Sequence, residues 1–102
     1  MTYISGAITD NPNYKRDFRR AERKLAIQGH EVVNPASIKL PKSATHANYM
    51  TVCMAMLSMC DKIYMLEGWS ISKGARLELD YARRNGIDII GVSVRDLIGG
   101  LR

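Results

Sequence analysis

The residues with the clearest chemical potential lie at positions 67–78, in the order EGWSISKGARLE. Two serines, a lysine and two glycines precede a carboxylate, Glu78, in this stretch. The apolar run at residues 62–66 before it predicts a buried strand. Residues 75–84 after it have the apolar spacing and the propensity of a helix. The stretch is therefore typical of a turn that joins a strand to a helix, with polar side chains at the junction.

Such a turn has the features of an anion site. A helix N-terminus presents free N–H groups and the positive end of the helix dipole, and glycines allow a ligand to approach the backbone. Ser70 or Ser72 can cap the helix, and Lys73 adds a full positive charge. We therefore expect a phosphate site at Ser72, Lys73 and Gly74. Glu78 follows about one helical turn later, where it can point at the same ligand.

A structural alternative exists for Glu78. On an exposed helix it would be a surface carboxylate that pairs with Lys73 or Arg76. The neighbouring polar turn favours the functional interpretation.

The elements around this turn alternate between strand and helix patterns. Strand-like runs occupy residues 1–5, 30–34, 62–66 and 87–92. Helical patterns occupy residues 14–28, 47–60 and 75–84, and a short terminal helix is predicted after residue 93. This alternation predicts a parallel sheet with helices on both faces, joined by right-handed connections. At 102 residues, the chain is expected to form one domain over residues 1–102.

Ligands of such sheets bind at the carboxyl ends of the strands, near the switch in strand order. Three loops should gather there, at residues 6–13, 34–43 and 67–74. The sequence thus predicts that the turn before Glu78 shares a cleft with the N-terminal loop. Asn34, at the end of the second strand, has an amide that can hold a sugar hydroxyl or a base edge. His46 lies in the long second connection and could touch the ligand, although a lone loop histidine is more often incidental.

Composition and cysteine usage limit the class of protein. An apolar fraction of 46% and a charged fraction of 25% are ordinary for a soluble globular protein. No apolar run approaches the roughly 20 residues that span a bilayer, and the N-terminus does not resemble a signal peptide. Cys53 and Cys60 lie two turns apart on one predicted helix, too far for a disulfide. They are expected to be reduced thiols of a cytoplasmic protein, and no Cys/His spacing indicates a metal site.

The net charge of +5 arises largely from one predicted helix. Its basic residues are Lys15, Arg16, Arg19, Arg20, Arg23 and Lys24, against Asp17 and Glu22. The simplest interpretation is a solvated helix face. The alternative is a patch that attracts nucleic acid or draws an anionic small molecule toward the site. Aromatic residues are not interleaved with these charges, so nucleic-acid binding is the less favoured interpretation.

The helix predicted at residues 47–60 is apolar on nearly every side. Its apolar residues are Met50, Val52, Cys53, Met54, Ala55, Met56, Leu57 and Met59. These are too many for one core face, so we expect this helix to pack also on a partner chain, in a homodimer or a higher homo-oligomer.

Four segments together carry a family resemblance. They are YISGAI at residues 3–8, VVNP at 32–35, residues 60–69 ending in LEGW, and SKGARLE at 72–78. With them the chain resembles the DUF4406 proteins, which are small and often phage- or prophage-borne. These are relatives of the nucleoside 2-deoxyribosyltransferases and the deoxynucleoside-monophosphate N-glycosidases. The likeness covers nearly the whole chain, and its most specific part is the string from residue 68 to residue 78.

The resemblance implies a three-layer α/β/α, flavodoxin-like (Rossmann-like) homodimer with a parallel sheet of four or five strands. It implies an enzyme without cofactor or metal that cleaves or exchanges the N-glycosidic bond of a (deoxy)nucleoside or its 5′-phosphate. Glu78 matches the glutamate that attacks the anomeric carbon, and Tyr3, the second expected catalytic residue, matches the opening tyrosine that borders the sugar. The expected ligand-binding residues are Ser5, Gly6, Ile8, Asn34, Trp69, Ser72, Lys73 and Gly74. Trp69 would pack over the turn, stack on a base, or do both.

Elementary chemistry agrees with the assignment of Glu78. An oxocarbenium-like centre is stabilised by an adjacent carboxylate, and a nearby helix start is expected to keep that carboxylate ionised.

One position departs from the pattern of these enzymes. They carry an aspartate that assists the departing base, eight residues before the position of Asp61, and Cys53 stands there in this chain. A buried thiol is a poor general acid. Asp10 in the first loop could replace it. The alternative function is a protein, encoded by a phage and located in the host cytoplasm, that binds or sequesters a nucleotide or an ADP-ribose-like ligand without turnover.

Overall fold

The sheet is fully parallel, as the alternating pattern predicts. A computed structural model describes residues 1–91, so the helix expected after residue 93 lies outside the described part. The strands are β1 (Thr2–Ser5), β2 (Val32–Val33), β3 (Lys62–Met65) and β4 (Asp88–Ile90). Their order in the sheet is β2-β1-β3-β4, with each neighbouring pair parallel.

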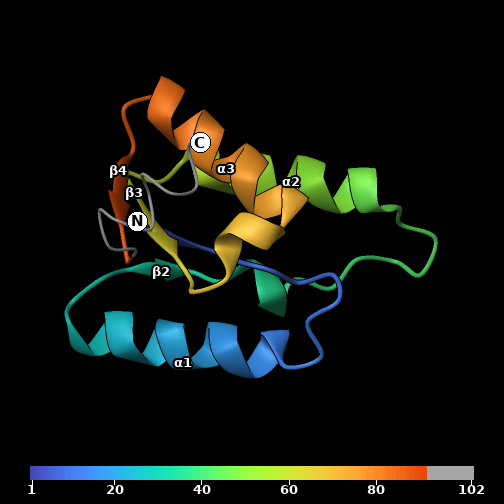
Figure 1. Ribbon diagram of the computed structural model, residues 1–102, viewed down its shortest axis with the longest axis horizontal. Coiled ribbons are helices and arrows are strands. Elements are labelled where there is room, and N and C mark those ends of the chain that lie inside the picture. The colour runs from blue at the N-terminus through green and yellow to red at the C-terminus, as the bar shows by residue number, and fades with distance from the viewer. Residues whose placement is uncertain (92–102) are drawn as a thin grey trace.

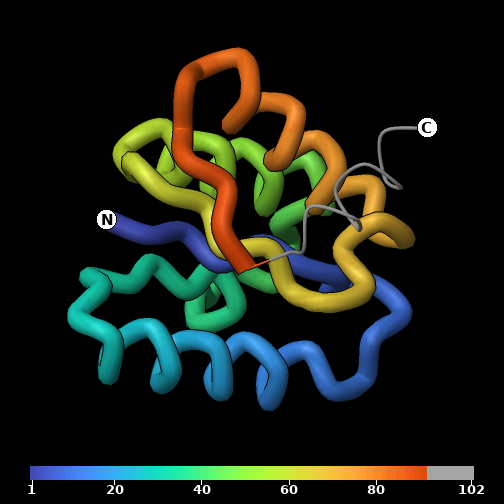
Figure 2. The backbone as a smooth tube through the Cα atoms, turned by 60° about the vertical axis from the view of Figure 1, so that its left-hand side comes forward, coloured from blue at the N-terminus to red at the C-terminus, as the bar shows by residue number. Residues whose placement is uncertain are grey.

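Three helices cover the sheet. They are α1 (Tyr14–Ile27), α2 (His46–Ser58) and α3 (Lys73–Arg84). Helix α1 lies on one face, and α2 and α3 lie together on the other (Figures 1 and 2). The three-layer α/β/α architecture expected from the sequence is confirmed, with a four-stranded, flavodoxin-like sheet.

The switch in strand order falls at β1. From β1 the chain passes through α1 to β2 on one side, and it then crosses to β3 on the other side of β1. The two connections lie on opposite faces, so their loops diverge beyond the carboxyl end of β1. This divergence opens the crevice in which ligands of parallel sheets bind.

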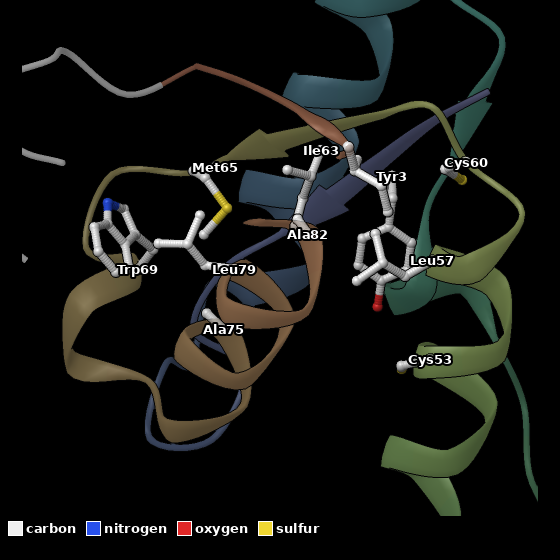
Figure 3. Packing of buried hydrophobic residues seen from close by; sticks show 11 residues of the cluster. Tyr3, Cys53, Leu57, Cys60, Ile63, Met65, Trp69, Ala75, Leu79 and Ala82 are labelled. Carbon is white, nitrogen blue, oxygen red and sulfur yellow. The ribbon is translucent and has the colours of Figure 1, made fainter. Parts of the chain in front are cut away.

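The core has two parts, one on each face of the sheet. Phe18, Ala21 and Leu25 are the buried residues of α1 and pack on Ile4 of β1. The cluster on the other face lies between the sheet, α2 and α3 (Figure 3). Its largest members are Tyr3, Leu57, Ile63, Met65, Trp69 and Leu79.

Two short 3₁₀ helices occur where the sequence predicted only loop or strand. Pro35–Ser37 forms because the Asn34 side chain accepts a hydrogen bond from the Ala36 N–H at 2.9 Å, which turns the chain out of the sheet. The strand expected at residues 30–34 is correspondingly shortened to Val32–Val33. Trp69–Ile71 is the second 3₁₀ helix, and it directly precedes the capping residue of α3.

The surface of α1 and of α2 differs in character. All six basic residues of α1 are exposed, as both interpretations of this charged face require. In α2 only Cys53 and Leu57 are buried, and Met59 beyond its end is 60% exposed.

Both cysteines are free thiols. Among residues 1–91, no helix is long and apolar enough to cross a membrane.

Candidate functional site

A pocket of about 380 Å³ opens beyond the carboxyl end of β1, between the loop after β1 and the N-terminal turns of α2 and α3. Its walls come from three regions of the chain that the sequence predicted to converge: the first loop, the start of the second connection, and the turn before α3. The lining residues from these loops and β1 are Tyr3, Ile4, Gly6, Ile8, Thr9, Asp10, Pro35, Ile71 and Ser72. The helices contribute Phe18, His46, Tyr49, Met50, Cys53, Lys73, Gly74, Ala75 and Glu78.

Glu78 is the buried carboxylate of this pocket, with only 5% of its surface exposed. Ser5 Oγ donates a hydrogen bond to Glu78 Oε1 at 2.8 Å, and Tyr3 Oη donates a short one to Glu78 Oε2. Tyr3 and Ser5 are two positions apart in β1, so their side chains point to the same face of the sheet. The strand thus supplies one donor to each oxygen of the carboxylate, and the pattern Tyr-x-Ser fixes the position of Glu78.

Burial governs the charge of Glu78. Loss of contact with water raises the pKa of Glu78 to about 7, although the hydrogen bonds from Tyr3 and Ser5 act in the opposite direction. The expectation that the helix start keeps this carboxylate fully ionised is therefore wrong, because a pKa of about 7 leaves part of it protonated at neutral pH. Glu78 lies beyond the first turn of α3, where the helix dipole has faded, and desolvation outweighs it.

The tyrosine stays a neutral donor. Burial, followed by the negative charge of Glu78, raises the pKa of the Tyr3 hydroxyl well above its usual range. Its ring extends from β1 between α2 and α3, with the hydroxyl directed toward the side of Cys53 (Figure 3). The surface alternative for Glu78 is also excluded, because it is buried and forms no ion pair with Lys73 or Arg76.

The N-terminus of α3 forms another part of the wall. Ser72 caps the helix, as predicted, and its Oγ accepts a hydrogen bond from the Ala75 N–H at 3.1 Å. Lys73 and Gly74 occupy the first positions of the helix, whose N–H groups have no partner within it. A Cβ on Gly74 would lie 3.3 Å from Met50 Sδ, so glycine lets α2 approach α3 closely here.

Seven of the predicted site residues lie together in the pocket. They are Tyr3, Gly6, Ile8, Ser72, Lys73, Gly74 and Glu78. Gly6 must be a glycine, since a Cβ there would lie 2.8 Å from Leu66 Cδ1. Ser5 is fully buried outside the pocket lining and is linked to the pocket by its hydrogen bond to Glu78.

Two predicted residues lie outside the pocket lining. Asn34 Nδ2 donates to Glu22 Oε1 at 3.0 Å, and its oxygen caps the following 3₁₀ helix, so both ends of the amide are engaged. Trp69 is 4% exposed and belongs to the same core cluster as Met65 and Leu79 (Figure 3). Its position agrees with the packing interpretation rather than with base stacking.

The α2 side of the pocket was largely missed by sequence reasoning. His46, Tyr49, Met50 and Cys53 follow the spacing i, i+3, i+4, i+7, which places them on one helix face. This spacing could have identified the pocket face of α2. Apolar residues also lie on its other faces, so the sequence does not indicate which face points toward the pocket. Tyr49 Oη donates to the Pro35 carbonyl at 2.8 Å and so ties α2 to the second loop.

Cys53 occupies the pocket wall as an un-ionised thiol. It is 1% exposed, and burial raises the pKa of its thiol. Within residues 1–91, no three His, Cys, Asp or Glu side chains cluster as metal ligands would. The polar groups of the pocket wall are side-chain carboxylates, hydroxyls, the imidazole of His46, the Lys73 ammonium group, the Cys53 thiol and the α3 N-terminus.

The fold and pocket define a class: parallel α/β proteins with a pocket at the switch in strand order. Within that class the chain belongs to the DUF4406 family, because the family model described as "Domain of unknown function (DUF4406)" matches residues 1–91. No curated protein and no solved structure matches the chain.

Proposed function

We propose that this protein is an enzyme that cleaves or exchanges the N-glycosidic bond of a (deoxy)nucleoside or its 5′-phosphate. The observation that carries the proposal is the buried Glu78 carboxylate, held by Tyr3 and Ser5 and opening into a pocket with a helix N-terminus in its wall. A carboxylate and an anion site in one cavity suit a sugar with a phosphate at one end and a scissile bond at the other.

In this mechanism Glu78 attacks C1′ of the sugar. The C1′–N bond breaks, its electron pair leaves with the base, and a glycosyl ester forms on Glu78. Water then attacks C1′ in hydrolysis, or a second base attacks it in transfer, and the carboxylate is released. Glu78 must be ionised for the first step, so its pKa of about 7 lets a large fraction of the protein react at neutral pH.

Tyr3 and Ser5 position the nucleophile. Each donates to a different oxygen of Glu78, which fixes the plane of the carboxylate and limits its rotation. Fixing a reacting group in its productive orientation reduces the entropic part of the barrier. Gly6, the next residue, leaves the adjacent backbone free for a sugar to approach.

The phosphate would bind at the start of α3. Ser72, Lys73 and Gly74 present a hydroxyl, an ammonium group and backbone N–H groups on one wall. The base would occupy the part of the pocket with apolar and aromatic side chains, which are Ile8, Phe18, Tyr49, Met50 and Ile71. The cavity volume of about 380 Å³ falls in the range of about 300–1,000 Å³ for small-molecule sites.

A second candidate is a protein that binds a nucleotide or an ADP-ribose-like ligand without turnover, for example to sequester a signal during phage infection. The specific observation that favours it is the un-ionised, buried thiol of Cys53, where related enzymes have an acid. Such a protein would use the same pocket and would not need Glu78 as a nucleophile.

Base release is the measurement that separates the two candidates. Purified protein is incubated with deoxynucleoside 5′-monophosphates, nucleosides and NAD-type compounds, and the released base is resolved by chromatography. We expect release from at least one (deoxy)nucleotide, and a higher kcat/KM for the 5′-phosphate than for its nucleoside. No release, together with a ligand-dependent rise in melting temperature, would instead establish the binding protein.

We also propose a cytoplasmic homodimer that uses the apolar surface of α2. Most apolar residues of α2 are incompletely buried within one chain, and both cysteines are free thiols, which suits a reducing compartment. Such a surface is stabilised by packing against the same surface of a second chain.

The oligomer has a direct test. Light scattering coupled to size-exclusion chromatography should give the mass of two or more chains of 11.4 kDa. Met59→Glu should weaken the association by at least about tenfold, because it places a charge in an apolar interface. Ile27→Glu, on the exposed end of α1, is the matched control and should leave the mass unchanged. A monomer at all concentrations would contradict the proposal.

A further inference from the structure

Helix α1 carries a row of arginines that the proposed function does not use. All are exposed, and they form an arginine stripe that consists of Arg16, Arg19, Arg20 and Arg23. Their spacing is i, i+3, i+4 and i+7, which at 3.6 residues per turn confines them to an arc of about 100° and a length of about 10 Å. The buried residues of α1 occupy the opposite side of the helix, so the stripe points away from the sheet.

The stripe lies on the outer surface of the described part of the molecule. Helix α1 is the single α-helix on its face of the sheet there, whereas α2 and α3, whose N-terminal turns border the pocket, lie on the other face (Figures 1 and 2). A large partner can therefore contact the stripe without entering the pocket.

The positive charge of the stripe is largely uncompensated, because the two acidic side chains of α1 are engaged elsewhere. Asn11 Nδ2 donates a hydrogen bond to Asp17 Oδ2 at 3.3 Å. Asn34 Nδ2 donates one to Glu22 Oε1 at 3.0 Å. Within residues 1–91 the stripe forms a single ion pair, between Arg16 and Asp17 at 3.7 Å. Like charges three and four positions apart repel each other along a helix, so an anion that binds the stripe would stabilise α1.

The chemistry of the stripe favours a phosphate backbone over other anionic surfaces. Arginine presents a planar fork of donors that matches the oxygens of a phosphate. A membrane-surface helix inserts an apolar face into lipid, and the apolar face of α1 is buried against β1. Specific protein interfaces depend on aromatic or apolar anchors at their centre, and the stripe has none.

The shape of α1 suits a DNA duplex. The major groove of B-DNA is about 12 Å wide and admits an α-helix, whereas the major groove of duplex RNA is deep and narrow. Arg19 and Arg20 lie at the two borders of the stripe, about 100° apart, from which they reach phosphates on opposite walls of the groove. Proteins bind single strands by stacking bases on exposed aromatic rings. The one aromatic residue between Arg16 and Arg23 is Phe18, which is buried, so this argument disfavours single strands and not a duplex.

We propose that the arginine stripe binds the phosphates of double-stranded DNA, with α1 in the major groove. The contact is electrostatic and is made to the backbone, so it depends strongly on salt and little on base sequence. It is independent of the N-glycosidase function, since the pocket and the stripe are separate surfaces.

The test measures binding of a short fluorescent DNA duplex to the full chain by anisotropy at several salt concentrations. The stripe variant has the changes Arg19→Gln, Arg20→Gln and Arg23→Gln. The matched control alters exposed basic residues of other segments, with the changes Lys39→Gln, Lys42→Gln and Arg76→Gln. Each variant removes three positive charges and lowers the formal net charge from +5 to +2. Melting temperatures report folding, and that of the stripe variant should not fall, because like-charge repulsion is relieved.

Four phosphate contacts predict a slope of about −3.6 when the logarithm of the binding constant is plotted against that of the salt concentration. This slope is a loss of about 10²-fold in affinity between about 50 and 200 mM salt. We expect the stripe variant to bind at least about tenfold more weakly at the lower salt concentration, with a slope near about −0.9. The control should stay within about threefold of the wild type and keep its slope.

Three results would overturn the proposal. Equal weakening in both variants would mean that net charge alone attracts DNA. Failure of the wild type to bind the duplex at about 50 mM salt, or tighter binding to a single strand of the same sequence, would exclude the duplex as the partner. Binding to phosphatidylserine vesicles without binding to the duplex would assign the stripe to a membrane surface instead.

Discussion

Replacing Glu78 by glutamine is expected to abolish base release, with kcat/KM lowered by at least about 10⁴-fold. The amide keeps the size of the carboxylate and can still engage Tyr3 and Ser5, so the pocket retains its shape. An amide oxygen carries no negative charge and neither attacks C1′ nor stabilises an oxocarbenium ion effectively. The change thus removes the nucleophile while leaving most binding contacts.

The measurement is the rate of base release by chromatography for the best substrate found with the wild-type protein. Glu31→Gln is the matched control, because Glu31 is an exposed carboxylate before β2, at the end of the sheet away from the pocket. It should retain full activity. A Glu78→Gln variant that keeps more than about a tenth of the wild-type rate would contradict the nucleophile role.

Ligand binding by the same variant gives an independent readout. If Glu78 acts only in the chemical step, substrate should raise the melting temperature of Glu78→Gln about as much as that of the wild type. A folded variant that has lost both turnover and binding would assign Glu78 to ligand recognition and would favour the non-catalytic candidate.

Much of the fold and part of the site follow from local sequence patterns. The alternation of strand and helix signals predicts the parallel sheet, because only buried parallel strands with intervening helices satisfy it. The cap at Ser72 follows from a serine just before a helical pattern. The convergence of the first loop with the turn before Glu78 follows from topology alone, since both leave the carboxyl ends of adjacent strands.

Other features depend on tertiary packing that one sequence does not specify. The apolar pattern of α2 surrounds the helix, so the sequence does not reveal that the face with Tyr49 and Cys53 meets the pocket. Asn34 has the chemistry of a ligand-binding residue, but an adjacent backbone N–H and the Glu22 carboxylate engage it. The depth of Glu78 is also tertiary, because it depends on how closely α3 packs against β1.

The burial of Glu78 is expected to make the stability of the folded protein depend on pH. Burial raises the pKa of Glu78 from an ordinary value of 4.5 to about 7 in the folded protein. Below pH 4.5 Glu78 is protonated in both the folded and the unfolded states, so with respect to this group the free energy of unfolding is at its highest. Between the two pKa values the unfolded state releases the proton while the folded state retains it. Stability from this group therefore falls as pH rises to about 7 and is constant above it.

The magnitude follows from the size of the pKa shift. Each pKa unit corresponds to about 1.4 kcal/mol, so the free energy of unfolding should fall by about 2 to 3 kcal/mol between pH 5 and pH 8 through Glu78 alone. For a domain of this size that corresponds to a lower melting temperature by roughly 10 to 20 °C. Ion pairs such as that between the Met1 amino group and Asp61 titrate too, but they are exposed and their effects are screened.

The comparison with Glu78→Gln isolates this contribution, because the glutamine does not titrate and the two proteins share every other ionisable group. Melting temperatures are measured for both from pH 5 to pH 8, with Glu31→Gln as the matched control. We expect the wild type to lose stability relative to Glu78→Gln as pH rises, and Glu31→Gln to follow the wild type. A constant difference between wild type and Glu78→Gln across this range would mean that water or a counter-charge reaches the carboxylate, and Glu78 would then titrate as an ordinary surface acid.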